Sequence, residues 1–272
     1  MKTFALAAAA LVAAAASLAA PPARAQEAPP SGLRLDLNLP ENRLRVFDGD
    51  TLLKTYRVSV GKPGHDTPDG EYRIATAEWN PWWRPPPREW ARDDRPTPPG
   101  PRNPMGRVKL FFAPLYYIHG TPDAENIGQA ASHGCVRMLN RDVVELARLL
   151  HSRQGGSLSP DAITRVLARS GETRASTLAS PVPLSIRYEP VVVREGELVV
   201  FPDIYDRKRV HAEAVIQALL GAGYDASSVD RAAIRRVLAR AGEGEGVFTV
   251  ALSEAFAGLR RAEPAEALGG GR

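Results

Sequence analysis

The sequence is poor in cysteine and, beyond its first 20 residues, in long apolar runs. Cys135 is the one Cys among 272 residues, which excludes a disulfide within the chain, although exported proteins commonly pair their cysteines. No stretch after residue 20 reaches the roughly 20 apolar residues that span a bilayer. An unpaired Cys is either a reactive thiol, an intermolecular partner or a small buried apolar side chain, and composition alone leaves these readings open.

Patterns for metal and nucleic-acid binding are also missing. The chain has no CxxC or HExxH motif, and Cys135 with two His residues at irregular spacing supplies only three metal ligands. We therefore expect no metal site. The net charge is only +4, and no basic stripe is interleaved with aromatics, so nucleic acid is not an expected partner.

The first 25 residues have the features of an export signal. Met1-Lys2 is a short basic start, Phe4 to Ala20 is rich in Ala and Leu, and Ala23-Arg24-Ala25 fits the small-x-small cleavage rule. We predict a signal peptide over residues 1–25 and an exported mature chain with no membrane span. The alternative is an uncleaved N-terminal anchor, which N-terminal sequencing of the exported protein distinguishes.

Alternating side chains predict a mainly β, sandwich-like fold. Leu33, Leu35, Leu37 and Leu39 alternate with polar residues, which is typical of a half-buried strand. Tight turns, including the Asp48-Gly49-Asp50 hairpin signal, separate further short strands. The predicted strands cover residues 33–39, 43–47, 52–60, 71–77, 108–112, 115–119, 184–188, 191–194 and 198–201.

Helical spacing follows Cys135 and returns near the C-terminus. Residues 141–150 carry apolar side chains three and four apart, and Asn140 is a suitable N-cap. His151 and His211 are expected on exposed helix surfaces, and residues 171–183 as a surface linker. Further helices are predicted over residues 161–168, 212–220 and 231–241, which makes the C-terminal extension α-rich.

Residues 78–105, named here the flap, hold all four Trp residues among many prolines. Proline excludes regular helix and central strand, and clustered Trp argues against disorder because large aromatic side chains favour burial. We interpret this segment as an ordered flap over a functional site. A purely structural Trp patch on the core is the alternative.

Cys135 has two histidines within reach along the sequence. His133 lies two residues before it, and His119 ends a predicted strand 16 positions upstream. A thiol becomes a strong nucleophile when a neighbouring base takes its proton, and imidazole suits that task near neutral pH. Backbone amides beside Gly134 could hold an oxyanion. Arg137 could pair with a substrate carboxylate or form a structural ion pair, and His65 could line the cleft.

These residues stand in a pattern that resembles a known family. Ile118-His119-Gly120-Thr121 and Ser132-His133-Gly134-Cys135-Val136-Arg137-Met138 resemble the active-site signature of the L,D-transpeptidases, the YkuD or ErfK/YbiS/YcfS/YnhG family. Similar family elements are residues 38–44, 61–64 with 67–70, and 103–106. The resemblance covers about residues 33–150, and a weaker one extends over residues 181–207.

The resemblance implies a division of the chain and a set of site residues. It implies a linker over residues 26–32, a catalytic domain over 33–206 with its core at 33–150, and a helical extension over 207–272. Cys135 is then the nucleophile and His119 the base, with the Gly120 carbonyl orienting its ring. Ser132 and His133 shape the loop, and the amides of Gly134 and Cys135 form the oxyanion hole. Predicted substrate contacts are Arg137, Tyr117, Thr121 and Met105.

The implied reaction is acyl transfer in the periplasm without a cofactor. The thiolate would cleave a peptidoglycan tetrapeptide stem, release D-Ala and pass the acyl group to an amine, and carbapenems would acylate the same thiol. The acceptor stays open among diaminopimelate, a Lys of an outer-membrane lipoprotein or other protein, a D-amino acid and water. Two alternatives remain: an L,D-carboxypeptidase or endopeptidase using the same nucleophile, and a non-catalytic wall-binding protein.

Overall fold

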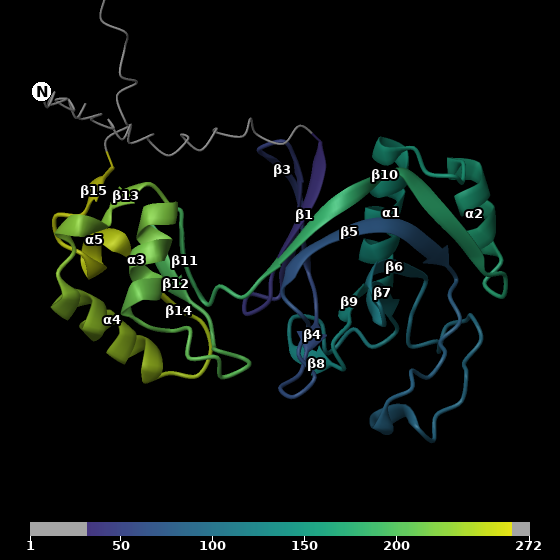
Figure 1. Cartoon of the computed structure of the whole chain (residues 1–272), viewed down its shortest axis with the longest axis horizontal. Coiled ribbons are helices and arrows are strands. Elements are labelled where there is room, and N and C mark those ends of the chain that lie inside the picture. The colour runs from purple at the N-terminus through teal and green to yellow at the C-terminus, as the bar shows by residue number, and fades with distance from the viewer. Residues whose placement is uncertain (1–31, 263–272) are drawn as a thin grey trace, which may run out of the picture.

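The computed structural model describes residues 32–262, which form two lobes with separate hydrophobic cores (Figure 1). The predicted signal peptide, all but the last residue of the predicted linker, and the C-terminal residues 263–272 lie outside the described residues. In the part that the structure describes, no helix is long and apolar enough to cross a membrane.

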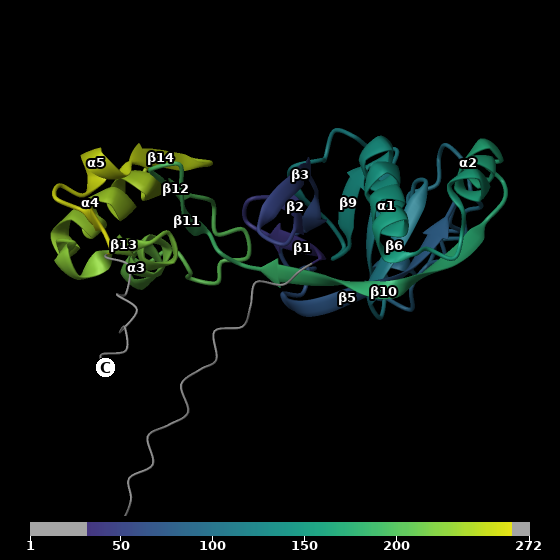
Figure 2. The same ribbon diagram turned by 90° about the horizontal axis from the view of Figure 1, so that it is seen from above.

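The larger lobe is mainly β, as predicted. Its strands are β1 (Leu33–Asn38), β2 (Arg43–Asp48), β3 (Thr51–Arg57), β5 (Gly70–Trp79), β6 (Val108–Ala113), β7 (Tyr116–Thr121), β9 (Val136–Leu139) and β10 (Arg174–Arg187). Within residues 32–262 they form one mixed sheet of eight strands in the order β3-β2-β1-β10-β5-β6-β7-β9. The long strands β5 and β10 arch across the lobe and join its two halves (Figure 2). Short strands β4 (Val60–Gly61) and β8 (Ala130–Ser132) pair beside this sheet.

Two helices complete the larger lobe, α1 (Asn140–Gln154) and α2 (Pro160–Ala168). The apolar face of α1 packs against β6, β7, β9 and β10. Asn140 is the first residue of α1 rather than its cap, which is Leu139. His151 is buried and not exposed as predicted, because its imidazole bonds to the carbonyl of Ala147 (2.9 Å) and to the hydroxyl of Ser176 (2.8 Å).

The predicted surface linker over residues 171–183 is wrong, because most of it belongs to the central strand β10. Two prolines made this strand hard to predict from the sequence. Proline cannot donate a hydrogen bond to a neighbouring strand, so it usually lies at sheet edges or bulges. Pro181 lies within the register shift between Thr177 and Val182 against β5. Pro183 pairs with Arg73 of β5, but it comes just before the pairing with β1 starts, at Leu184.

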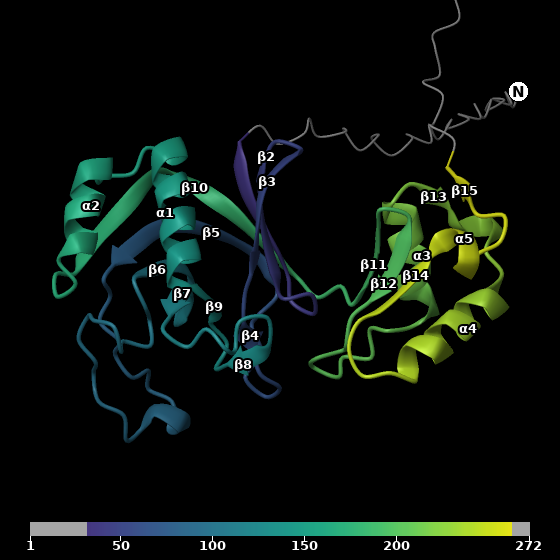
Figure 3. The ribbon, with the colours of Figure 1, turned by 180° about the vertical axis from the view of Figure 1, so that it is seen from behind.

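The smaller lobe combines strands with helices. Its elements are β11 (Val191–Arg194), β12 (Glu197–Val200), α3 (Ala212–Gly221), β13 (Tyr224–Asp225), the 3₁₀ helix η2 (Ala226–Ser228), α4 (Arg231–Gly242), β14 (Phe248–Ala251), α5 (Leu252–Ala255) and β15 (Arg260–Arg261). Helices α3 and α4 and the sheet β11-β12-β14 enclose its core (Figure 3). The division into domains at residue 206 stays a prediction; the two cores separate earlier, between Ile186 and Val191.

Candidate active site

Strand alternation sorts the residues of β7 and β9 into a core face and a cavity face. Ile118 pairs with Val136, and both are fully buried in the core. Because successive side chains of a strand point to opposite faces, the next pair, His119 and Arg137, faces the other way. Cys135, directly before β9, shares that face. All three line one cavity of about 570 Å³, so the strand register brings the predicted nucleophile and base together.

The thiol of Cys135 is protonated in the resting structure. Burial raises its pKa to about 11. A hydrogen bond from the backbone N–H of Tyr117 and the charges of Arg137 and Lys109 act in the opposite direction. The thiol lies 3.6 Å from the carbonyl oxygen of Leu115, to which it donates. Leu115 has φ +66 in the turn between β6 and β7, a conformation that is unfavourable for a branched residue without glycine's freedom. This strained turn therefore supplies the acceptor that holds the neutral thiol.

His119 is buried and neutral, with one ring nitrogen left for proton transfer. Its Nδ1 lies 2.6 Å from the carbonyl oxygen of Gly120. A carbonyl only accepts, so Nδ1 carries the proton and Nε2 is the basic nitrogen. Burial lowers the pKa of His119 to about 4; Arg137 and Lys109 act in the same direction and the Gly120 bond opposes them. The thiol and the imidazole therefore rest as a neutral pair at pH 7.

The Gly120 carbonyl is held by close backbone packing. A Cβ on Gly120 would lie 2.3 Å from Oδ1 of Asn140, and a Cβ on Gly106 would lie 2.1 Å from the same oxygen. That oxygen instead accepts the backbone N–H of Arg107 at 2.9 Å. Because neither glycine has a side chain, Asn140 can come close enough to hold the backbone at Arg107, just before β6 and behind His119.

The loop before Cys135 is stabilised by its own serine. Ser132 Oγ donates to the carbonyl of Cys135 (2.6 Å) and accepts the N–H of Gly134 (3.0 Å). The Gly134 amide is therefore engaged within the loop, and its role in an oxyanion hole stays a prediction. Gly134 is required for another reason: it has φ +107, and a Cβ there would lie 2.8 Å from the ring of Tyr116.

The flap reaches residues 132–134 before Cys135, named here the catalytic loop, through Trp90. This residue lies in the 3₁₀ helix η1 (Glu89–Ala91), in the blue segment at the lower right of Figure 1. Its ring stacks on His133 with 4.0 Å between centroids, while His65 meets the same imidazole edge-on at 4.7 Å. Burial lowers the pKa of His133, and Lys62, His65 and Arg137 act in the same direction.

The flap is also ordered from within. The side-chain amide of Asn103 donates to the carbonyls of Pro81 (3.0 Å), Thr97 (2.9 Å) and Pro98 (2.9 Å). Trp82, Trp83 and Trp90 line the cavity that contains Cys135. The flap is thus a fixed wall of the candidate site in this structure.

Arg137 supplies a positive charge to the cavity. Lys109 is paired with Glu78 at 3.0 Å, whereas the half-buried guanidinium of Arg137 makes no hydrogen bond or ion pair within residues 32–262. A half-buried, unpaired guanidinium is suited to a planar carboxylate. Within the same range, no group of three His, Cys, Asp or Glu side chains is arranged to hold a metal ion.

The protein-family model for the YkuD L,D-transpeptidase catalytic domain matches residues 33–182 of this sequence, which is more than half of the chain. The chain belongs to this family. YkuD of Bacillus licheniformis, named as an L,D-transpeptidase, is 34% identical over 128 residues, which cover 47% of this chain and 66% of that protein. ErfK/SrfK of Escherichia coli K12, named likewise, is 33% identical over 116 residues, covering 39% and 37% respectively.

The chain thus spans less than two thirds of the length of these curated relatives. Among solved structures, L,D-transpeptidase 3 of Mycobacterium tuberculosis is 12% identical and has a TM-score of 0.36, covering 57% of this chain and 61% of that one.

The structure brings most of the predicted L,D-transpeptidase site residues together. Those lining the cavity are Cys135, His119, His133, Ser132, Arg137, Tyr117 and Met105. Gly120 and Gly134 contact them from behind. Thr121 does not line the cavity; it is buried, and its hydroxyl accepts the N–H of Asp123 at 3.1 Å.

Some site residues had not been singled out from the sequence. Lys109 and Phe111 face the cavity from β6, and alternation against the apolar Leu110 could have placed them there. Leu115 gave no local signal, because its role depends on a turn conformation and a backbone carbonyl.

Proposed function

We propose that this chain is a peptidoglycan L,D-transpeptidase that transfers the acyl group of a tetrapeptide stem through Cys135. The observation that carries the proposal is the neutral pair of Cys135 and His119 facing one cavity with the unpaired guanidinium of Arg137. This arrangement fits nucleophilic acyl transfer next to a carboxylate-bearing side chain. The diaminopimelate residue of the stem supplies both features.

The first half-reaction forms a thioester. As the sulfur of Cys135 attacks the carbonyl of the third stem residue, its proton passes to Nε2 of His119. The tetrahedral intermediate collapses when the carbon–nitrogen bond breaks, and the proton on His119 leaves with the amine of D-Ala. Because burial disfavours both charged forms, proton transfer is coupled to attack and does not precede it.

The second half-reaction releases the enzyme. An acceptor amine attacks the thioester, gives a proton to His119, and that proton returns to the sulfur as the new amide forms. The acceptor is a diaminopimelate amine, a protein Lys such as that of an outer-membrane lipoprotein, or a D-amino acid; water would instead give a carboxypeptidase.

We place this reaction in the periplasm, in keeping with the export signal predicted for residues 1–25. N-terminal sequencing of the protein from the periplasmic fraction should start at Gln26. A protein found there that still starts at Met1 would contradict cleavage.

A direct test uses the mature chain, residues 26–272, with a diaminopimelate-containing tetrapeptide. Mass spectrometry should show loss of D-Ala and cross-linked dimers, together with a thioester adduct on Cys135. Tripeptide alone would assign hydrolysis instead. Cys135→Ala should abolish all products, and His119→Gln should slow them at least 100-fold, as removal of a general base does. Full activity in Cys135→Ala would refute the proposal.

A further inference from the structure

The chain between β12 and α3 leaves the smaller lobe and returns to the larger one. Residues 202–209, named here the return segment, follow a strand of the smaller core, yet Ile204 and Tyr205 pack against the larger core. Asp206 (φ 51) and Lys208 (φ 56) take left-handed backbone conformations, which are unfavourable for residues other than glycine. Such strain persists where surrounding contacts over-determine the backbone.

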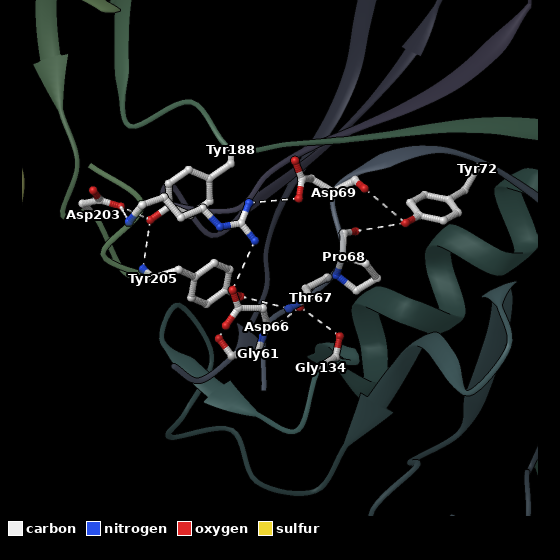
Figure 4. A network of polar contacts seen from close by, with 11 residues as sticks. Gly61, Asp66, Thr67, Pro68, Asp69, Tyr72, Gly134, Tyr188, Asp203 and Tyr205 are labelled. Carbon is white, nitrogen blue, oxygen red and sulfur yellow. Dashed lines mark hydrogen bonds and ion pairs between the residues drawn. The ribbon is translucent and has the colours of Figure 1, made fainter. Parts of the chain in front are cut away.

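The carboxylate of Asp203 supplies those contacts. It accepts the backbone N–H groups of Arg207 (3.0 Å) and Arg209 (3.1 Å) and the hydroxyl of Tyr188. The return segment is therefore a built turn with a defined shape. It presents two side chains to the larger lobe, Tyr205 and Arg207. Figure 4 shows Tyr205 beside Gly61 and Thr67 of that lobe.

The hydroxyl of Tyr205 joins the two ends of a turn in the larger lobe. It donates to the carbonyl of Gly61 (2.9 Å) and accepts the N–H of Thr67 (3.2 Å). Thr67 is fully buried, and its own hydroxyl accepts the N–H of Gly61 (2.8 Å). That hydroxyl then donates to the carbonyl of Gly134 at 2.9 Å. Figure 4 shows the continuous path from Tyr205 through Thr67 to the residue before Cys135.

Arg207 holds the outer side of the same turn. Its guanidinium pairs with Asp66 (3.2 Å) and Asp69 (2.9 Å). It also lies over the rings of Tyr188 and Tyr205, at 4.5 Å and 5.0 Å from their centroids. These rings stack on each other at 5.4 Å, so the anchor is one packed unit.

The turn over residues 61–67 contacts the catalytic loop at successive positions. The N–H of Lys62 donates to the carbonyl of Ser132 at 2.9 Å, and His65 meets His133 at 4.7 Å. The hydrogen bond from Thr67 to Gly134 completes the set, so each residue from 132 to 134 contacts this turn. The backbone that aims Cys135 therefore depends on a turn whose two ends are closed by Tyr205.

We propose that Tyr205 is a positioning residue for Cys135, through which the smaller lobe sets the geometry of the catalytic loop. The inference rests on the proposed acyl transfer, because it concerns how well Cys135 attacks. Tyr205 touches neither the thiol nor the cavity, so its loss should slow attack without weakening the binding of the acylating compound.

The test is the rate at which a carbapenem acylates Cys135 in the mature chain, followed by intact-protein mass spectrometry over a range of carbapenem concentrations. Tyr205→Phe keeps the ring and removes the hydroxyl, which leaves the buried Gly61 carbonyl and Thr67 amide without that partner. We expect the limiting rate of acylation to fall at least tenfold, with a half-saturating concentration within twofold of that of the unmodified protein. The matched control is Tyr224→Phe in the smaller lobe, which should change neither value.

A double-mutant cycle separates positioning from a general loss of stability. Thr67→Val keeps the shape of the side chain and removes the hydrogen bonds of its hydroxyl to Gly61 and Gly134. If Tyr205 acts through Thr67, Tyr205→Phe should slow acylation far less in the Thr67→Val background than alone. Arg207→Ala, compared with Lys208→Ala, gives a second pair in which only the former should slow acylation.

The outcomes distinguish the two proposals. No adduct on Cys135 in the unmodified protein would overturn the proposed function and this inference with it. An adduct that forms equally fast in Tyr205→Phe, or strictly additive effects in the cycle, would overturn the positioning role alone.

Discussion

Cys135 and His119 rest as neutral groups because burial opposes charge on both. The cavity face contains positive charges that favour a thiolate, but desolvation is the larger effect on the thiol. For His119 the same burial and the same charges act together, and both keep the ring neutral. The two groups therefore do not rest as an ion pair, and in the proposed reaction the charge needed for attack would develop only as the substrate carbonyl arrives.

Neutral His119 should make stability depend on pH. The unfolded chain binds this proton at a pKa near 6.5, whereas the folded chain binds it only at about 4. The contribution is therefore fully present above pH 6.5 and is lost as the pH falls towards 4. Urea unfolding at pH 7.5 and 4.5 should differ by roughly 2–3 kcal/mol more in the unmodified protein than in His119→Gln. An equal pH dependence in both proteins would contradict a depressed pKa.

Gly120→Ala should damage both the fold and the base. The new Cβ would meet Oδ1 of Asn140 at 2.3 Å, so the backbone must shift at a cost of roughly 1–3 kcal/mol. That shift moves the carbonyl that orients His119, and acylation should slow at least tenfold. Gly171→Ala is the control, since no atom lies within 4 Å of its Cβ. Thermal unfolding and carbapenem acylation check both effects, and unchanged acylation in Gly120→Ala would count against the orienting role.

The flap and β10 show how proline-rich segments differ once folded. In β10, Pro181 falls in a register shift against β5 and Pro183 comes before the pairing with β1 starts, so the strand continues. In the flap they exclude regular structure, and Asn103 replaces the missing ladder by collecting three carbonyls. The flap then contributes Trp90 to the catalytic loop as a stacking partner for His133.

Removal of this stacking partner should change the titration of His133. Trp90→Ala exposes the imidazole to water, and because burial is the largest cause of its lowered pKa, the pKa should rise towards the ordinary value. NMR of the histidine ring protons over pH 5–8 measures this shift. Trp82→Ala is the matched control, because Trp82 and Trp90 are both 38% exposed but only Trp90 stacks on His133. The same titration in both variants would rule out shielding by Trp90.

The two lobes are joined by more than the chain. Glu41, 6% exposed, accepts hydrogen bonds from Arg45 of the larger lobe and Arg194 of the smaller. Burial acts to raise the pKa of Glu41, but the two guanidinium groups hold it below its usual value. Together with the return segment, this contact joins the smaller lobe to the larger one through side chains as well as through the chain.

Arg194→Ala should lower the free energy of unfolding by roughly 1–2 kcal/mol at pH 7, because a buried carboxylate loses one of its partners. The lowered pKa of Glu41 means that the contribution is present above pH 4.5 and disappears as the pH falls through the folded-state value. Urea unfolding at pH 7 and at acid pH should show this convergence. Arg240→Ala breaks a pair with Glu254 whose side chains are 52% and 60% exposed, and should cost less than about 1 kcal/mol. Equal losses in both variants would show that the bridge is no stronger than a surface pair.

Local sequence predicted the parts of this protein that depend on neighbours along the chain. The alternation of Leu33 to Leu39, the helix after Cys135 and the spacing of His119 and Cys135 in a family signature all act within one element or one loop. For that reason the mainly β fold and the family membership were predicted correctly. The roles of His119 and Cys135 stay predictions, with a geometry that supports them.

Only the tertiary structure decided how distant residues share one site. His151 lies in the core because Ser176 reaches it across 25 positions, and β10 forms because it pairs with both β1 and β5 in spite of its prolines. The Gly134 amide donates to Ser132, and the Tyr205 hydroxyl accepts the N–H of Thr67 across 138 positions. The sequence by itself specified the chemical groups of the site, because side-chain chemistry is local. Which groups contact one another was decided by tertiary packing, because those contacts form only when the whole chain is folded.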